Sequence, residues 1–201
     1  MAFLRSGVGY EHAASIRGHG VWLRAPVASD YVAWAELRQM SRAHLTPWEP
    51  QWTPDELSRS SFKMRLRHYA REARDDLGYA YLIFRTGDDM LIGGLTLSSV
   101  RRGVSQSASL GYWMGLPYIR RGYMCAAVEA AIHHGYEALR LHRIEAACLP
   151  WNAASIAVLE GSGFVREGLA RQYLKINGVW QDHLLYARLP VPIAPAAGCG
   201  A

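Results

Sequence analysis

The sequence predicts a mixed α/β domain, and three observations support this prediction. Three strand-like runs follow one another between residues 79 and 115 with short polar connections, which is typical of an antiparallel meander. An alanine-rich helical run and a further strand come next, which is typical of a crossover unit. Near the end, an Asn-Gly pair between two strand-like runs predicts a hairpin.

Composition limits the class of protein. The chain has 201 residues and half of them are hydrophobic, which is enough for one domain with a real core and argues against a disordered or fibrous protein. We therefore expect a single domain over residues 1–201, with its core at about 21–189. The formal charge of +5 favours anionic partners such as phosphates, nucleic acid or acidic proteins.

Cysteines and histidines lack the spacing of a metal site. Cys125, Cys148 and Cys199 are odd in number and far apart, so we expect reduced thiols. The histidines form no HExxH pattern, and the adjacent pair His133 and His134 would face different ways on a helix. We predict no metal.

The N-terminus has no apolar signal core and no uncharged run is long enough to cross a bilayer, so we expect a cytoplasmic protein without a membrane partner.

The first elements are a strand and two helices. "VWLRAP" (21–26) predicts the strand, and Ser29 or Asp30 can cap a helix that carries Val32, Trp34, Leu37 and Met40. In "TPDE" we expect Thr53 to cap a second helix, with Pro54 in the first turn and Glu56 closing a capping box. The basic run "KMRLRHYAREAR" behind it favours a solvated helix face.

The remaining elements follow in order. Strands are expected at 79–84, 91–100 and 107–115, a helix at about 122–139 and a strand at 143–149. A short helix follows, where Asn152 can cap the first turn and Gly163 suits the left-handed residue that closes the last. Asn177 and Gly178 mark the hairpin turn. The tail 190–201 is rich in Pro, Ala and Gly, and we expect it to be loose.

The start of the 122–139 helix suggests an anion site. A helix N-terminus offers unpaired N–H groups and the positive end of the helix dipole, and Gly122 would let phosphate oxygens approach closely. Arg120 and Arg121 add positive charge. By itself this pattern is more often a simple turn, since neither a Walker loop nor a GxGxxG fingerprint is present.

A wider stretch resembles a known family. "LGYWMGLPYIRRGYMCAAVEAAIHHGYEALRLHRIEAACLPWNAASIAVLEGSGFVREG" resembles the acetyl-CoA-binding half of the GNAT superfamily of N-acetyltransferases. "LRAP", "SRAHLTPWEP" and "ARQYLKINGVWQDHLLYARL" are similar to its RimJ/RimL branch, which acetylates N-terminal amines of ribosomal proteins. The resemblance covers about residues 21–189. The usual phosphate-loop pattern Q/R-x-x-G-x-G/A is altered, with Ile119 first and Met124 last, but main-chain N–H groups hold the phosphates.

The resemblance implies the fold and the cofactor. It implies a GNAT fold, a largely antiparallel splayed sheet flanked by helices, with acetyl-CoA in the V between the strand ending "GYWMG" and the strand "RIEAACL". The backbone of Trp113 and Met114 would pair with the pantetheine amides. The residues implied for the pyrophosphate are Arg120, Arg121, Gly122, Tyr123, Met124 and Cys125.

The implied reaction is direct attack of an amine on the thioester, which needs a proton donor for the departing thiolate and a base for the amine. The N-x-x-S pattern of the branch makes Ser155 the acid and Asn152 a cofactor or water contact. The alternative is that Asn152 is only a helix cap and Ser155 only an exposed hydroxyl. Glu145 lies in an apolar strand and points either to solvent or into the acceptor tunnel, as base or as the residue that holds a water.

Other base candidates lie on the last hairpin, where Leu174 occupies the position of the branch's base. They are Tyr173, Asp182 and His183, whereas Tyr112 is interpreted as packing.

The aromatic segment "TPWEPQW" lines the acceptor side in the resemblance. Trp48 and Glu49 could grip a peptide N-terminus, with the carboxylate attracting the ammonium, or the segment could be a lid over the core.

The function we predict is acetyl transfer to the N-terminus of a ribosomal protein or another peptide, by a monomer or homodimer. Two alternatives are a small-molecule acetyltransferase acting on an aminoglycoside, polyamine or amino acid, and a non-catalytic RNA-binding or ribosome-assembly protein. RNA contact is a secondary expectation.

Overall fold

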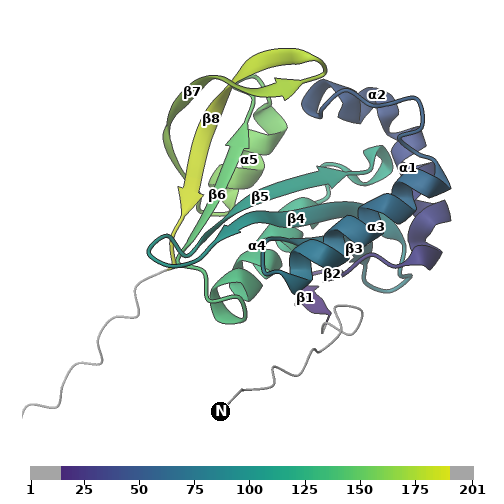
Figure 1. The fold of residues 1–201 in the computed structure, drawn as a ribbon, viewed down its shortest axis with the longest axis horizontal. Helices are drawn as coiled ribbons and strands as arrows, with labels where there is room; N and C mark the ends of the chain where they lie inside the picture. Colours follow the sequence, from purple (N-terminus) through teal and green to yellow (C-terminus); the bar gives the residue numbers. More distant parts are fainter. Residues whose placement is uncertain (1–14, 191–201) are drawn as a thin grey trace, which may run out of the picture.

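The computed structural model describes residues 15–190 and contains an 8-stranded sheet with the strand order β1-β2-β3-β4-β5-β6-β8-β7 (Figure 1). Neighbouring strands are antiparallel except β5 and β6, which are parallel. The expected loose tail lies outside the described residues from position 191 on. The strands are β1 (Ile16–Gly18), β2 (Val21–Arg24), β3 (Tyr79–Arg85), β4 (Leu91–Arg101), β5 (Ser107–Met114), β6 (Arg143–Cys148), β7 (Val165–Ile176) and β8 (Val179–Arg188).

Helices cover both faces of the sheet (Figure 1). One face packs against α4 and α5, where Ile144 and Ala146 of β6 meet Val128 of α4 and Leu159 of α5 in the larger core cluster. The other face packs against α1 and α3 in a smaller, more aromatic cluster. The helices are α1 (Tyr31–Met40), α2 (Arg42–Leu45), α3 (Arg59–Arg74), α4 (Tyr123–Glu137) and α5 (Ala153–Gly161), with 3-10 turns η2 (Ala28–Asp30), η3 (Thr46–Trp48) and η4 (Leu116–Tyr118).

The mixed α/β class, the meander, the crossover and the hairpin are confirmed. Both hairpin turn residues have positive φ, 44° at Asn177 and 83° at Gly178, as a type I′ turn requires. Gly163 has φ 72° and follows α5 in the left-handed conformation that was expected. Strand β1 was not anticipated, because three residues are too few for a periodic pattern.

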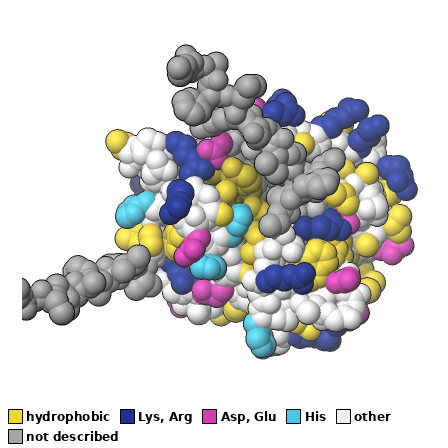
Figure 2. Space-filling model, turned by 90° about the horizontal axis from the view of Figure 1, so that it is seen from below, with side chains coloured by type: hydrophobic (Ala, Val, Ile, Leu, Met, Phe, Trp, Pro, Cys, Tyr) yellow, Lys and Arg dark blue, Asp and Glu magenta, His cyan; other side chains and the backbone are white. Residues whose placement is uncertain are grey.

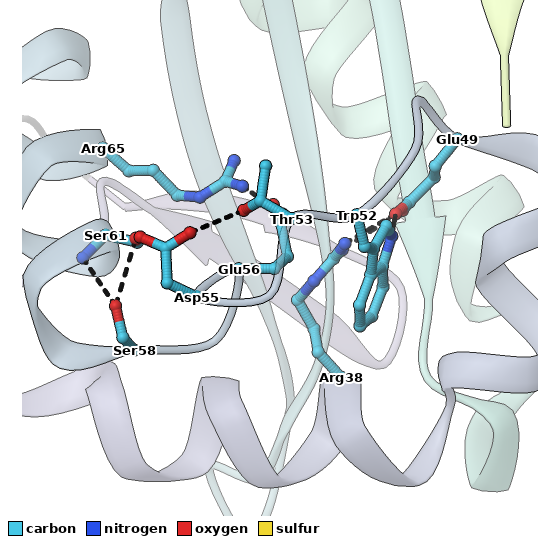
Figure 3. A network of polar contacts seen from close by, with 9 residues as sticks. All are labelled: Arg38, Glu49, Trp52, Thr53, Asp55, Glu56, Ser58, Ser61 and Arg65. Carbon is cyan, nitrogen blue, oxygen red and sulfur yellow. Dashed lines mark hydrogen bonds and ion pairs between the residues drawn. The ribbon is translucent and has the colours of Figure 1, made fainter. Parts of the chain in front are cut away.

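The predicted start of the second helix is wrong. The helix begins at Arg59, where the side chain of Ser58 accepts the Ser61 N–H and caps it. Thr53 instead donates its hydroxyl to Asp55 at 2.8 Å (Figure 3). Glu56 pairs with Arg65 rather than reaching back to the Thr53 N–H. The two side chains of the expected capping box thus have other partners, and residues 54–57 form a turn.

The first helix buries a narrower face than the sequence predicted. Trp34 and Leu37 are buried, whereas Val32 and Met40 are exposed. Asp30 precedes the helix, but its carboxylate accepts hydrogen bonds from the Arg24 guanidinium and the Val27 N–H and caps nothing in α1. The strand β2 is therefore tied to the start of α1 by a half-buried ion pair.

The sheet opens between β5 and β6. The two strands pair from Ser107 and Arg143 to Leu110 and Ala146, and then separate. Beyond that point β5 still pairs with β4 as far as Met114, and β6 still pairs with β8 as far as Cys148. Each strand therefore keeps its outer partner while the inner edges diverge, which leaves backbone groups along the inner edges without a partner strand. This is the V that the resemblance implied.

Candidate active site

The start of α4 is open and uncapped. Gly122 precedes the helix with φ 78°, and α4 has no side-chain cap. Its first N–H groups therefore have no partner within the helix. A Cβ added at Gly122 would meet nothing within 4 Å, and Arg120 and Arg121, which directly precede it, are exposed. An open, uncapped helix start with positive dipole and flanking guanidiniums is suited to hold phosphates.

The other predicted phosphate-loop residues follow on α4. The side chain of Met124 is buried in the core, so that this bulky residue leaves the helix start unobstructed. Tyr123 and Cys125 are half-buried. At these positions the main chain, rather than the side chains, faces the open end of the helix.

The end of β5 presents its backbone to the gap. Gly115 donates its N–H to the Ile92 carbonyl at 2.9 Å, on the β4 side. Because successive residues of a strand alternate in direction, the N–H and C=O of Met114 point away from β4 and into the gap. The Trp113 ring packs over Gly94, where a Cβ would collide with the indole. Of the two residues expected to pair with pantetheine, Met114 has the favourable backbone orientation.

Ser155 and Tyr112 meet at the open side of the V. The Tyr112 hydroxyl lies 2.7 Å from Ser155 Oγ and 3.3 Å from the Ser155 carbonyl oxygen. Burial raises the pKa of Tyr112, so the phenol stays protonated, and burial also raises the pKa of the nearby Cys148 thiol. Asn152 accepts the Ser155 N–H at 3.0 Å and caps α5, as expected. The arrangement is a neutral hydroxyl pair that can donate a proton.

Glu145 lies on the paired side of the split. It stands opposite Ser109 of β5, before the strands separate. Its carboxylate binds Arg143 at 2.8 Å and also Arg101, and Arg143 extends the cluster to Glu167. Of the two orientations left open by the sequence, the structure therefore has the one outside the V, and Glu145 is an ion-pair partner there.

The acceptor-side segment is organised around Arg38 (Figure 3). Arg38 is 6% exposed and donates to both carboxylate oxygens of Glu49, at 3.2 and 2.6 Å. Glu49 also accepts the Trp52 indole N–H at 2.8 Å. The Glu49 carboxylate is thus already neutralised and not open to an acceptor ammonium, whereas Trp48 is half-buried in η3. The Arg38 guanidinium lies 4.6 Å from the ring centre of Trp52 and 5.0 Å from that of Trp113.

The last hairpin closes against this segment. The Glu49 carbonyl accepts the N–H of Asn177 at 2.9 Å, and a Cβ on Gly178 would lie 3.3 Å from the Gln51 side chain. Figure 1 shows the hairpin tip reaching toward α2. Sequence reasoning missed Arg38, although a charged residue one position after Leu37 on the buried side of a helix was a signal for a buried pair.

Of the hairpin's base candidates, His183 has a suitable nitrogen. It is 2% exposed, and its Nδ1 lies 2.9 Å from the Gln181 carbonyl oxygen. A carbonyl only accepts, so the hydrogen bond places the hydrogen on Nδ1 and the lone pair on Nε2. Asp182 is used otherwise, since it accepts the Gln172 N–H at 2.8 Å in a β-bulge, and the Tyr173 ring packs edge-on to His183.

Ser155 and His183 belong to opposite faces of the sheet. Leu184 and Tyr186 of β8 lie in the core beneath α4 and α5, so the alternating His183 faces the other way. Ser155 lies on α5 itself. The hydroxyl pair therefore lies on the α5 face of the sheet, and the His183 imidazole lies on the opposite face.

Comparison with known proteins decides the family. Residues 21–165 match the family model described as the acetyltransferase (GNAT) domain. The chain belongs to the GNAT acetyltransferase family. It is an acetyl-CoA-dependent N-acetyltransferase, and the open helix start and the splayed strands of this chain fit that co-substrate.

Two of the similar proteins are named as acetyltransferases of a ribosomal protein. The chain is 32% identical over 160 residues to the [ribosomal protein uS5]-alanine N-acetyltransferase of Escherichia coli, a match that covers 79% of this chain and 82% of that protein. The ribosomal-protein-S5-alanine acetyltransferase of Vibrio fischeri superposes with a TM-score of 0.82 at 31% identity, covering 90% and 100% of the two chains. RimJ of Mycobacterium smegmatis in complex with CoA-disulfide superposes with a TM-score of 0.81 at 34% identity. The match covers 88% of this chain and 86% of that chain.

Residues 15–190 offer neither a metal-ligand cluster nor a membrane-spanning helix. No group of three or more His, Cys, Asp or Glu side chains is placed to hold a metal ion in this range. Among the helices of the same residues, none is long and apolar enough to span a membrane.

Replacing Gly122 with valine should weaken acetyl-CoA binding by at least about tenfold, because a β-branched side chain is strained at φ 78° and fills the space before the helix start. Isothermal titration calorimetry measures the effect. Gly103→Val is the matched control: Gly103 has φ 64° and open space around it but lies in the β4–β5 connection. Equal affinities for the two variants would contradict this role.

Proposed function

We propose that this acetyltransferase acts on the free N-terminal α-amino group of a protein, with a ribosomal protein as the acceptor. The observation that carries the proposal is the similarity over most of the chain to enzymes named for alanine acetylation of a ribosomal protein, uS5 or S5. A second relative from Escherichia coli, 30% identical over 112 residues, is named a ribosomal-protein-serine acetyltransferase.

The charges near the V support a peptide N-terminus over a polycationic small molecule. An aminoglycoside or polyamine would be recognised by unpaired carboxylates near the site. Of the carboxylates that the sequence pointed to, Glu49 pairs with Arg38 and Glu145 pairs with Arg101 and Arg143, while Asp182 accepts the Gln172 N–H. A single α-amino group has a pKa of about 8 and needs neither an acidic pocket nor a strong base.

Bound acetyl-CoA supplies the activated acetyl group as a thioester. The chain's own part begins with the N–H groups at the start of α4, which hold the phosphates, and the Met114 backbone, which extends the sheet toward the pantetheine arm. Ser155 Oγ–H is the proton donor for the leaving sulfur. When the Tyr112 hydroxyl donates to Ser155 Oγ, the serine hydrogen is free to turn toward the V, and the hydrogen-bonded chain polarises it.

His183 is the base of the proposed mechanism. Its Nε2 lone pair, fixed by the hydrogen bond from Nδ1 to Gln181, accepts a proton from the acceptor ammonium on the face opposite Ser155. The proton donor and the proton acceptor then act on the two sides of the thioester carbonyl.

Thiol release measured with a panel of acceptors tests the function. Peptides with free N-terminal alanine or serine should be turned over, and N-terminal blocking should abolish turnover because no α-amino group remains. A lysine-only peptide with a blocked N-terminus and an aminoglycoside should give no release above background. Preferred turnover of the aminoglycoside, or of the blocked lysine peptide, would contradict the proposal.

Ser155→Ala should lower kcat by about 10- to 1000-fold while the affinity for acetyl-CoA changes by less than about twofold, because the serine acts on the leaving group. Tyr112→Phe should give a smaller loss of kcat, since it removes only the hydrogen bond to Ser155. Ser60→Ala on the exposed side of α3 is the matched control. Steady-state kinetics and calorimetry together measure both effects, and an unaltered kcat in Ser155→Ala would remove this residue as the acid.

His183→Ala should reduce kcat by about 100-fold or more, and added imidazole should restore part of it, because imidazole can occupy the vacated volume and accept the proton. A purely structural histidine would not be rescued in this way. A His183→Ala enzyme that stays folded and retains full kcat would exclude the base role.

A further inference from the structure

Four basic side chains follow one another along the outward face of α3. Spacings of four, four and three residues place them on one side of the helix, and all four are exposed. The opposite side of α3 faces the sheet, with Phe62 in the smaller core. The row spans about 16 Å along the helix. We call it the basic stripe: Lys63, Arg67, Arg71 and Arg74.

The basic stripe has no carboxylate partner within 4 Å among residues 15–190. Arg65, on another side of the same helix, pairs with Glu56, and Arg101 and Arg143 of the sheet share Glu145. Like charges four residues apart repel each other on a helix. The basic stripe is therefore an unneutralised surface that a bound anion would stabilise.

Three members of the stripe, Arg67, Arg71 and Arg74, line a shallow hollow of about 420 Å³ together with Met64 and His68. Nδ1 of His68 lies 3.5 Å from a guanidinium nitrogen of Arg71, so the surface also carries an imidazole ring. In the view from below, Figure 2 shows Lys and Arg side chains along the upper right rim of the molecule. The surface is concave and carries several guanidinium groups.

We propose that the basic stripe binds the phosphate backbone of a folded RNA. Guanidinium groups match phosphate oxygens in geometry and charge, and a row of them along one helix follows a chain of phosphates. A membrane is disfavoured, because the apolar side of α3 is already packed against the sheet. A protein interface would be centred on large apolar or aromatic anchors, and the exposed apolar side chain here is Met64.

The position of α3 connects this surface to the acceptor side. The helix follows directly after residues 49–58, the segment that Glu49 joins to Arg38 and to the hairpin. The choice of RNA among polyanions rests on the proposed function, since a ribosomal protein lies against RNA. An RNA held by the stripe would keep such an acceptor close to the active site.

Fluorescence anisotropy with a labelled RNA stem-loop tests the stripe. The variant Lys63→Gln, Arg67→Gln, Arg71→Gln is compared with Arg140→Gln, Arg171→Gln, Lys175→Gln, which removes the same charge from exposed positions elsewhere. The stripe variant should bind RNA at least about tenfold more weakly, and the slope of log affinity against log salt should fall by about 0.7 to 0.9 per lost contact. The control triple should change affinity by less than about twofold.

The same affinity loss in both triples, or none in the stripe variant, would overturn the proposal. Tighter binding of wild type to an acidic peptide or to duplex DNA than to the stem-loop would overturn the choice of RNA. The assay contains neither acetyl-CoA nor acceptor, so its failure is distinct from failure of the transfer reaction. The stripe variant should keep wild-type turnover of a short peptide, which also shows that it is folded.

Discussion

The site depends on one constraint, the end of the pairing between β5 and β6 after Leu110 and Ala146. Both strands continue because each is still hydrogen-bonded on its outer side, to β4 and to β8. A strand edge with unpaired N–H and C=O groups in a folded protein needs a partner, and an extended amide-containing ligand can supply one. The helix start of α4, the α5 hydroxyl pair and the hairpin all lie around the opening that this separation creates.

A second interaction shapes the opposite face of the V. Arg38 is a buried cation whose charge is neutralised by Glu49 and whose guanidinium lies among aromatic rings. A buried charge without its partner is costly, so this pair ties α1 to residues 49–52. The Glu49 carbonyl then binds the hairpin turn at Asn177. Segments that are far apart in the sequence are thereby joined next to Trp113, at the edge of the acceptor side.

Much of the architecture could be predicted from local pattern. Alternating apolar residues and the Asn177-Gly178 turn identified the strands and the hairpin, and Asn152 and Gly163 marked both ends of α5. The start of α3 could not be located, because whether Thr53 or Ser58 caps it depends on the partners Asp55 and Arg65. Contacts between distant segments were also beyond reach. The meeting of Tyr112 with Ser155 and the pairing of Glu49 with Arg38 are set by the tertiary packing, and they give Tyr112 and Glu49 other contacts than the sequence suggested.

The most direct test of the account is hydrogen–deuterium exchange of backbone amides with and without acetyl-CoA, because the central claim is that main-chain groups hold the co-substrate in the V. The amides at 122–125, where α4 begins, and at Met114 should exchange more slowly when acetyl-CoA is bound, while amides at the far end of the sheet near Gly103 should not change. Protection elsewhere with unchanged exchange at these positions would contradict the claim that this opening is the acetyl-CoA site.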